Sequence, residues 1–317
     1  MISVNNNQML IQVREARFQP KTVLQLLLFA AVFLVGNTVA AVIMTAPTLV
    51  GVFTDRALLA ALASGDIDGA FAAMSSVLER PWVMLLSLFA TAATTLASIL
   101  YCRKIEKRSF ASMGFRKKGW FLRYLKGYAI GTAMLLLCAL ILWLTGDLDF
   151  SFSGNIPVFY LLVFFVGFVI QGMSEEVLVR GYFMVSLSNR CRTAAAVGIS
   201  SVAFALLHLA NPGISLLALL NLTLFGIFMA VYILRTDDLW GACAIHSAWN
   251  FAQGNLVGIR VSGMTQLPTV AVMEPLGNRS YLHGGNFGLE GGLIVTLVTL
   301  IAIVLTLFLP QKQDSLA

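Results

Sequence analysis

Apolar runs long enough to cross a bilayer recur along the whole chain. Each approaches the roughly 20 apolar residues that a helix needs to span the hydrocarbon core. Lipid offers no partners for backbone polar groups, so such runs fold as helices. The sequence therefore predicts an all-α, polytopic membrane protein of about eight transmembrane helices. The predicted spans are 23–45, 82–101, 124–145, 157–178, 193–210, 214–234, 239–259 and 288–309.

Composition agrees with a membrane protein and excludes other classes. Hydrophobic residues make up 58% of the 317-residue chain and charged residues only 11%, which is too little charge for a soluble domain. The net charge of +6 does not indicate nucleic-acid binding, because the basic residues lie in loops beside the spans. The cysteines have no CxxC spacing, so they suggest neither a disulfide framework nor a thiolate metal site. They are Cys102, Cys138, Cys191 and Cys243.

The loop charges predict the orientation in the cell membrane. Residues 102–126 hold nine Lys or Arg and one Glu, so this loop is expected in the cytoplasm. An even number of spans then places both termini in the cytoplasm. The expected organisation is a cytoplasmic segment 1–22, a single transmembrane domain 23–309 and a cytoplasmic tail 310–317.

The two longest external loops differ in their patterns. Residues 46–81 have helical apolar spacing interrupted at Gly65 and Asp66, which favours a short pair of helices. Residues 260–287 are rich in Gly and hold two prolines, so we expect an irregular loop there.

Ionisable side chains inside a membrane are expensive and mark candidate functional sites. Glu176 and Arg180 are four residues apart, so they share a helix face and can form an ion pair. His246 and Asn250 have the same spacing. The residues of interest within the spans or directly beside them are Glu175, Glu176, Arg180, His208, His246 and Asn250.

Three helices can bring these groups to one depth if the fourth helix is unusually long, tilted or broken at Gly172. We expect it to continue beyond residue 178 to a turn near Arg190. Glu175 and His208 would then both lie roughly 24 Å from that turn, at 1.5 Å per residue. His246 lies roughly 14 Å from the turn before its own helix. The sequence therefore predicts a buried cavity formed by the core helices, the fourth to the seventh.

The predicted cluster suits hydrolysis. A carboxylate and an imidazole that face one water molecule form a general-base pair, and a second His with an Asn can donate to an oxyanion. Two His and one Glu are also a common zinc set, so a divalent metal such as zinc stays an alternative. A transporter or proton relay buries the same residue types. A non-catalytic scaffold or immunity protein is a third possibility.

Three motifs resemble the CPBP family of intramembrane proteases. They are EExxxR at 175–180, FxxxH at 204–208 and HxxxN at 246–250, within roughly residues 155–260. The family includes the eukaryotic endopeptidase that trims prenylated CAAX proteins and bacterial relatives linked to bacteriocin processing and immunity.

The resemblance implies an intramembrane endopeptidase of about eight helices. Glu175 and His208 would activate water, while His246 and Asn250 would stabilise the oxyanion. Glu176 and Arg180 would brace the site, and Phe204 would pack against it. The expected substrate is a membrane-associated protein or peptide, prenylated or of the bacteriocin type. Family members have been called metalloproteases, but water activated by glutamate needs no metal, and we prefer that mechanism.

Overall fold

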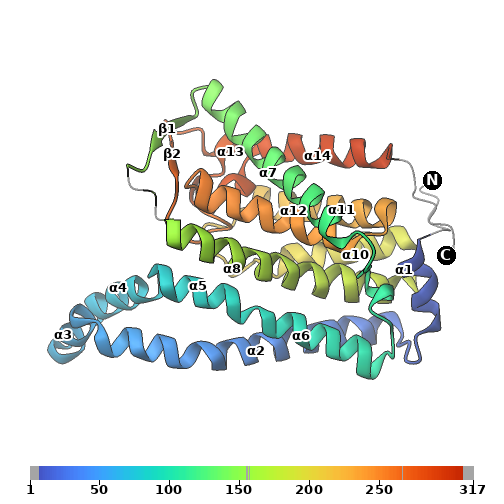
Figure 1. Ribbon diagram of the computed structural model, residues 1–317. Coiled ribbons are helices and arrows are strands. Elements are labelled where there is room, and N and C mark those ends of the chain that lie inside the picture. The colour runs from blue at the N-terminus through green and yellow to red at the C-terminus, as the bar shows by residue number, and fades with distance from the viewer. Residues whose placement is uncertain (1–6, 155, 157, 266, 310–317) are drawn as a thin grey trace.

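The computed structural model describes residues 7–154, 156, 158–265 and 267–309 (Figure 1). It confirms an all-α membrane fold. Within the described residues, five helices are long and apolar enough to cross a membrane. Their bounds are Thr22–Thr54, Pro81–Ile105, Trp120–Leu144, Val158–Ser188 and Leu216–Thr236. The other three predicted spans correspond to shorter helices, so the count of eight stays a prediction. The predicted tail 310–317 lies outside the described residues.

The first layer is a long helical hairpin. It follows the short α1 (Gln8–Gln12) and consists of α2 (Thr22–Thr54), α5 (Pro81–Ala90) and α6 (Ala92–Leu100). The helix α2 runs nine residues beyond its predicted end at 45 and includes Pro47. A transmembrane helix tolerates proline where neighbouring groups satisfy the freed carbonyl.

The predicted helix pair is confirmed between these two arms, while its external placement stays a prediction. It consists of α3 (Arg56–Ser64) and α4 (Ile67–Leu78). Gly65 ends α3 with a left-handed φ of +72°, which suits glycine, and Asp66 caps α4 by accepting from the Gly69 amide.

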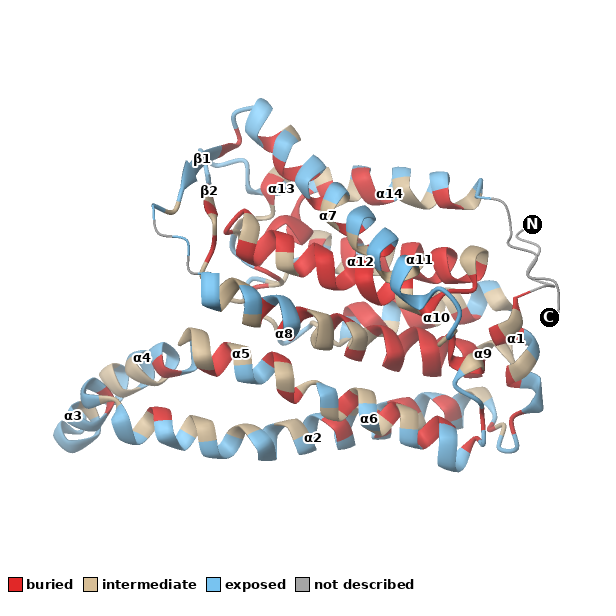
Figure 2. Cartoon of the chain, in the orientation of Figure 1, coloured by how far each residue is buried: buried red, intermediate tan, exposed pale blue. Residues whose placement is uncertain are grey.

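The second layer carries the core. It contains α7 (Trp120–Leu144), α8 (Val158–Glu176), α9 (Val185–Ser188), α10 (Thr193–Leu206), α11 (Leu216–Thr236), α12 (Leu239–Phe251) and α14 (Leu293–Leu307). Buried residues concentrate along α11 and α12 and in the helical continuation of α8 up to Ser188 (Figure 2). Gly127 and Gly131 let α7 approach α12 closely, because an added Cβ would collide with the carbonyls of Gly241 and Ile245.

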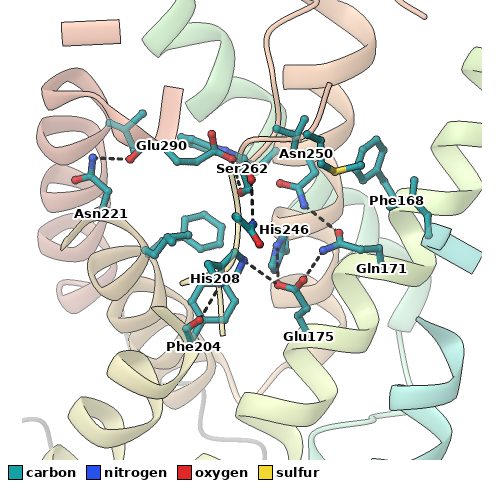
Figure 3. Close-up of a pocket in the computed structure, with 18 residues that line it drawn as sticks. Phe168, Gln171, Glu175, Phe204, His208, Asn221, His246, Asn250, Ser262 and Glu290 are labelled. Carbon is teal, nitrogen blue, oxygen red and sulfur yellow. Dashed lines mark hydrogen bonds and ion pairs between the residues drawn. The ribbon is translucent and has the colours of Figure 1, made fainter. Parts of the chain in front are cut away.

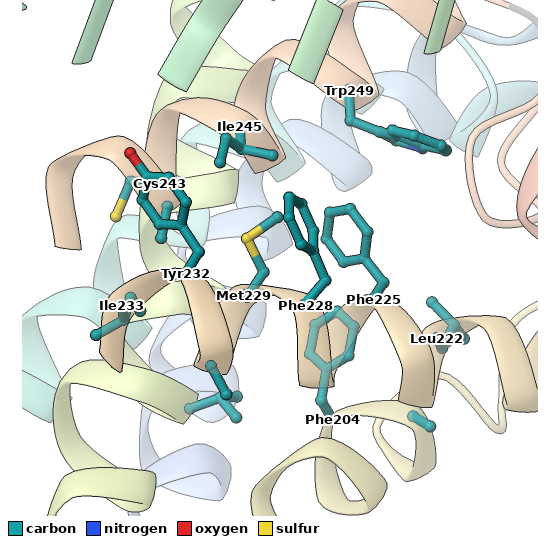
Figure 4. Close-up of a cluster of buried hydrophobic side chains, with 14 of the residues drawn as sticks. Phe204, Leu222, Phe225, Phe228, Met229, Tyr232, Ile233, Cys243, Ile245 and Trp249 are labelled. Atoms are coloured by element: carbon teal, nitrogen blue, oxygen red, sulfur yellow. The ribbon is translucent and has the colours of Figure 1, made fainter. Parts of the chain in front are cut away.

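An apolar cluster between α11 and α12 fixes the helix that carries His246. Phe225, Phe228 and Met229 point from α11 toward α12 (Figure 4). The Phe225 ring lies 5.4 Å from the His246 ring and 5.7 Å from the Trp249 ring, measured between centroids.

One loop prediction needs correction, and a second loop holds a buried charge that was not foreseen. Residues 260–287 are not wholly irregular, because β2 (Ala271–Pro275) pairs antiparallel with β1 (Leu148–Phe152), and α13 (Ser280–His283) follows. The second is the loop 102–126, whose place in the cytoplasm stays a prediction. Its Arg108 is fully buried beneath the continuation of α8.

Candidate active site

The helix that carries the two acids is long, as expected. Beyond α8 it continues through a π-helical segment, Val177–Met184, and α9 to Ser188, giving 31 residues in all. The change from α to π geometry comes directly after Glu176. Such π segments are frequent at functional sites. Glu175 therefore lies in the middle of a continuous helical path and not at its end.

Glu175 faces both intramembrane histidines (Figure 3). Its Oε2 atom lies 3.6 Å from His246 Nε2 and 3.9 Å from His208 Nε2. Both distances are too long for direct hydrogen bonds and are of a size that a water molecule can bridge. This Oε2 atom is buried and has no hydrogen-bond partner among the described residues. The predicted convergence of the three side chains is thus present in the structure.

His208 lies on a turn and not in a helix. The sequence predicts a span to residue 210, but α10 ends at Leu206, four residues earlier. The Nδ1 atom of His208 lies 2.9 Å from the Phe204 carbonyl. A carbonyl only accepts, so Nδ1 carries the proton, and Nε2 of the neutral ring is an acceptor that faces Glu175.

Glu176 orients the second histidine from behind. Its Oε1 atom lies 2.8 Å from His246 Nδ1 and accepts from Arg180 Nη1 at 3.1 Å. The Glu176 and Arg180 side chains are fully buried. The Arg180 guanidinium stacks 4.5 Å from the centroid of the Phe204 ring. The predicted ion pair is therefore present, and it holds the His246 ring in place.

Asn250 connects to the acid through Gln171, which the sequence analysis missed. Asn250 Nδ2 donates to Gln171 Oε1 at 2.9 Å, and Gln171 Nε2 donates to Glu175 Oε1 at 2.6 Å. The available signal was a lone amide in an apolar run, four residues before Glu175, and so on the same helix face.

These groups surround a cavity of about 130 Å³. A single buried water needs roughly 10–15 Å³ by the same kind of measure, so the cavity has room for several. The lining combines the polar groups above with apolar and aromatic side chains. Those apolar side chains are Leu88, Phe168, Phe204, Leu222, Phe225, Trp249, Val261, Met264 and Val295.

The side-chain geometry of the described residues does not decide the zinc alternative. Among these residues, no group of three or more His, Cys, Asp or Glu side chains is arranged to hold a metal ion. Glu176 holds His246 Nδ1 and a backbone carbonyl holds His208 Nδ1, so both Nε2 atoms stay directed at Glu175. Histidines that bind metals are commonly held in the same way, so these contacts do not argue against a metal. The preferred mechanism without a metal stays a prediction that metal analysis can test.

Comparison with known families bears on the segment that holds this site. Residues 157–252 match the family described as type II CAAX prenyl endopeptidase Rce1-like. This segment belongs to the Rce1-like family. Neither the curated proteins nor the solved structures gave a match. The Rce1-like segment runs from the start of α8 to the end of α12 and contains Glu175, His208, His246 and Asn250. The match confirms the predicted family for this segment and supports a CAAX-type intramembrane endopeptidase in general.

Proposed function

We propose that this protein hydrolyses a peptide bond in a membrane-associated protein or peptide, using water activated by Glu175 and His208. The supporting observation is that Glu175 Oε2 faces the Nε2 atoms of both histidines at 3.6 and 3.9 Å on the cavity wall. A general base must lie within reach of the proton that it removes, directly or through one water.

In the proposed first step, Glu175 takes a proton from water while the water oxygen attacks the scissile carbonyl. His208 Nε2 accepts the second hydrogen bond from that water and orients it. Gln171 donates to Glu175 Oε1, which leaves Oε2 directed at the cavity. Glu175 then gives its proton to the leaving amine as the tetrahedral intermediate collapses, so the carboxylate is regenerated.

In the same proposal, His246 and Asn250 stabilise the oxyanion of that intermediate. Asn250 Nδ2 is a donor at the cavity wall. His246 donates from Nε2 when the ring carries both protons, with its Nδ1 atom held by the Glu176 carboxylate. Preorganised donors of this kind are worth about 10² to 10³ each in turnover.

The cavity walls favour an apolar substrate group. Phe168, Phe225 and Trp249 line it with Met264, beside the polar catalytic groups. We therefore propose a peptide that carries a lipid-like or strongly apolar portion. A prenylated C-terminal peptide and a bacteriocin-type peptide are the two candidate substrate types.

The direct test compares wild type with Glu175→Gln on fluorogenic peptides of both types in detergent or liposomes. We expect turnover to fall by about 10² to 10⁴, the contribution of a positioned general base. Glu274→Gln is the matched control, because Glu274 is an exposed carboxylate on β2. Equal turnover by wild type and Glu175→Gln, at equal thermal stability, would rule out the mechanism.

Metal removal tests the remaining alternative. We expect purified protein to keep its activity after dialysis against a strong chelator and to hold less than stoichiometric zinc. The measurements are elemental analysis and turnover on the same sample. Activity that disappears with the chelator and returns with zinc would contradict water held by protein groups alone and would support water bound to zinc.

A further inference from the structure

The segment 258–292, which is described except for residue 266, packs directly on the turn that carries His208. Asn211 Nδ2 donates to the Ser262 carbonyl at 2.9 Å. Gly263 has a left-handed φ of +83°, and an added Cβ there would collide with the Pro212 carbonyl. A Cβ added to Gly213, at φ +75°, would lie 3.0 Å from backbone atoms of Asn286 and Phe287. Glycines at these contacts let two backbones meet.

Glu290 holds this segment together from inside. It is 7% exposed and lines the same cavity as Glu175 (Figure 3). Its Oε1 atom accepts from Ser262 Oγ at 3.0 Å, and its Oε2 atom accepts from Gln253 Nε2. Its backbone carbonyl accepts from Asn221 Nδ2 at 2.8 Å. These partners are neutral donors, so they fix the position of the carboxylate without pairing its charge.

Ser262 transmits this restraint toward His208. Its φ of +47° is unusual for a residue with a Cβ, and such a conformation persists where the surroundings hold it. Glu290 holds its hydroxyl, and Asn211 holds its carbonyl. The backbone N–H of Asn211 in turn donates to the His208 carbonyl at 3.0 Å. A continuous chain of contacts therefore runs from Glu290 to the histidine.

His208 needs such support because its helix has already ended. The bond from His208 Nδ1 to the Phe204 carbonyl limits the ring orientation. The position of the turn itself depends on what packs against residues 209–213. A displacement of about 1 Å at a reacting group can cost roughly 10² in rate.

We infer that Glu290 is a positioning residue, which sets the place of His208 through Ser262 and Asn211. The inference rests on the proposed function, in which His208 orients the attacking water. It also extends the working site beyond the matched segment 157–252.

The activity test uses Glu290→Ala, Glu290→Gln and Ser262→Ala, with Glu274→Gln as control. We expect kcat to fall about 10- to 100-fold in Glu290→Ala, with KM changed less than about threefold. The kcat of Ser262→Ala should also fall, and this variant replaces Glu290→Ala in the test if Glu290→Ala folds poorly. Glu290→Gln should keep most of the activity, because its amide can accept from Gln253 and donate to the Ser262 hydroxyl. If the kcat of Glu290→Gln falls as far as that of Glu290→Ala, the charge or the proton of Glu290 is required, and the positioning role is wrong.

A double-mutant cycle separates positioning from an unrelated structural effect. If Glu290 acts through His208, the variant with both Glu290→Ala and His208→Ala should be no slower than His208→Ala alone, within about threefold. Losses that multiply would show that the two residues act independently, which would overturn the inference.

Amide hydrogen exchange gives a readout that does not depend on cleavage. We expect peptides covering residues 206–214 to exchange at least about tenfold faster in Glu290→Ala, since local opening exposes their amides. Glu290→Gln and Glu274→Gln should match wild type. If wild type cleaves neither peptide, the proposed function fails, but hydrogen exchange still tests whether Glu290 holds the His208 turn. If Glu175→Gln abolishes cleavage but exchange in Glu290→Ala is unchanged, only the inference fails.

Discussion

At the scale of single residues, Gln171 joins the two halves of the candidate site. Its amide donates to Glu175 Oε1 and accepts from Asn250 Nδ2. A carboxylate only accepts, so the amide nitrogen must face Glu175, and its oxygen then faces Asn250. One side chain thereby orients the proposed base and a proposed oxyanion donor.

Gln171→Leu should therefore impair catalysis more than folding. The change keeps a similar volume and removes both hydrogen bonds, so we expect kcat to fall about 10- to 100-fold as Glu175 and Asn250 lose their orientation. Peptide cleavage and thermal unfolding measure the two effects. Asn37→Leu is the control, because it replaces an exposed amide on α2, in the other layer. A Gln171→Leu enzyme with wild-type kcat would show that Gln171 does not orient the site.

At the scale of elements, the π-helical segment Val177–Met184 is held from the loop that precedes α7. Arg108 donates to the Gly181 carbonyl at 3.0 Å and to Ser186 Oγ at 2.8 Å, and it pairs with Glu106 at 3.1 Å. Both side chains of the ion pair are essentially inaccessible to solvent. The buried Arg108–Glu106 pair therefore stabilises the π-helical segment, which directly follows Glu175 and Glu176.

Arg108→Ala should lower the free energy of unfolding by about 3–5 kcal/mol, because it leaves the Glu106 carboxylate buried without its partner. Arg108→Lys should recover only part of this loss, since an ammonium group lacks the fork that reaches several acceptors. Unfolding in detergent micelles measures both. Lys118→Ala, an exposed change in the same loop, is the control. Equal stability of the Arg108→Ala and Lys118→Ala proteins would contradict a structural role for Arg108.

At the scale of the whole molecule, a chain that crosses a bilayer carries local sequence signals, and these signals decide which features could be predicted. Long apolar runs and polar pairs four residues apart are strong local signals, so the helical fold and the convergence of Glu175 with His208 and His246 could be anticipated. Gln171 and Glu290 are single polar residues whose partners come from distant segments.

Other features depend on contacts between remote segments in the same way. The strand β1 pairs with β2, more than 100 residues away, without a local turn that would signal pairing. The buried role of Arg108 could not be separated from that of the other basic residues in its loop. The division into segments 1–22, 23–309 and 310–317 stays a prediction.

The orientation in the membrane is the remaining whole-molecule prediction. The basic loop 102–126 should lie in the cytoplasm, and the acidic loop 145–156 outside. Cys191→Ser provides the background for labelling, because the other three cysteines are buried. Lys118→Cys and Asp149→Cys then place one exposed thiol in each loop.

An impermeant maleimide should label Asp149→Cys in intact cells and Lys118→Cys only in inverted vesicles. The unsubstituted Cys191→Ser protein should react in neither and serves as the control. Labelling of both positions from one side would mean that α7 does not cross the membrane, and reversed labelling would overturn the inside placement of the basic loop. The result also locates segment 258–292. Its β2 strand pairs with β1, so the loops that hold the His208 turn must share the side on which residue 149 is labelled.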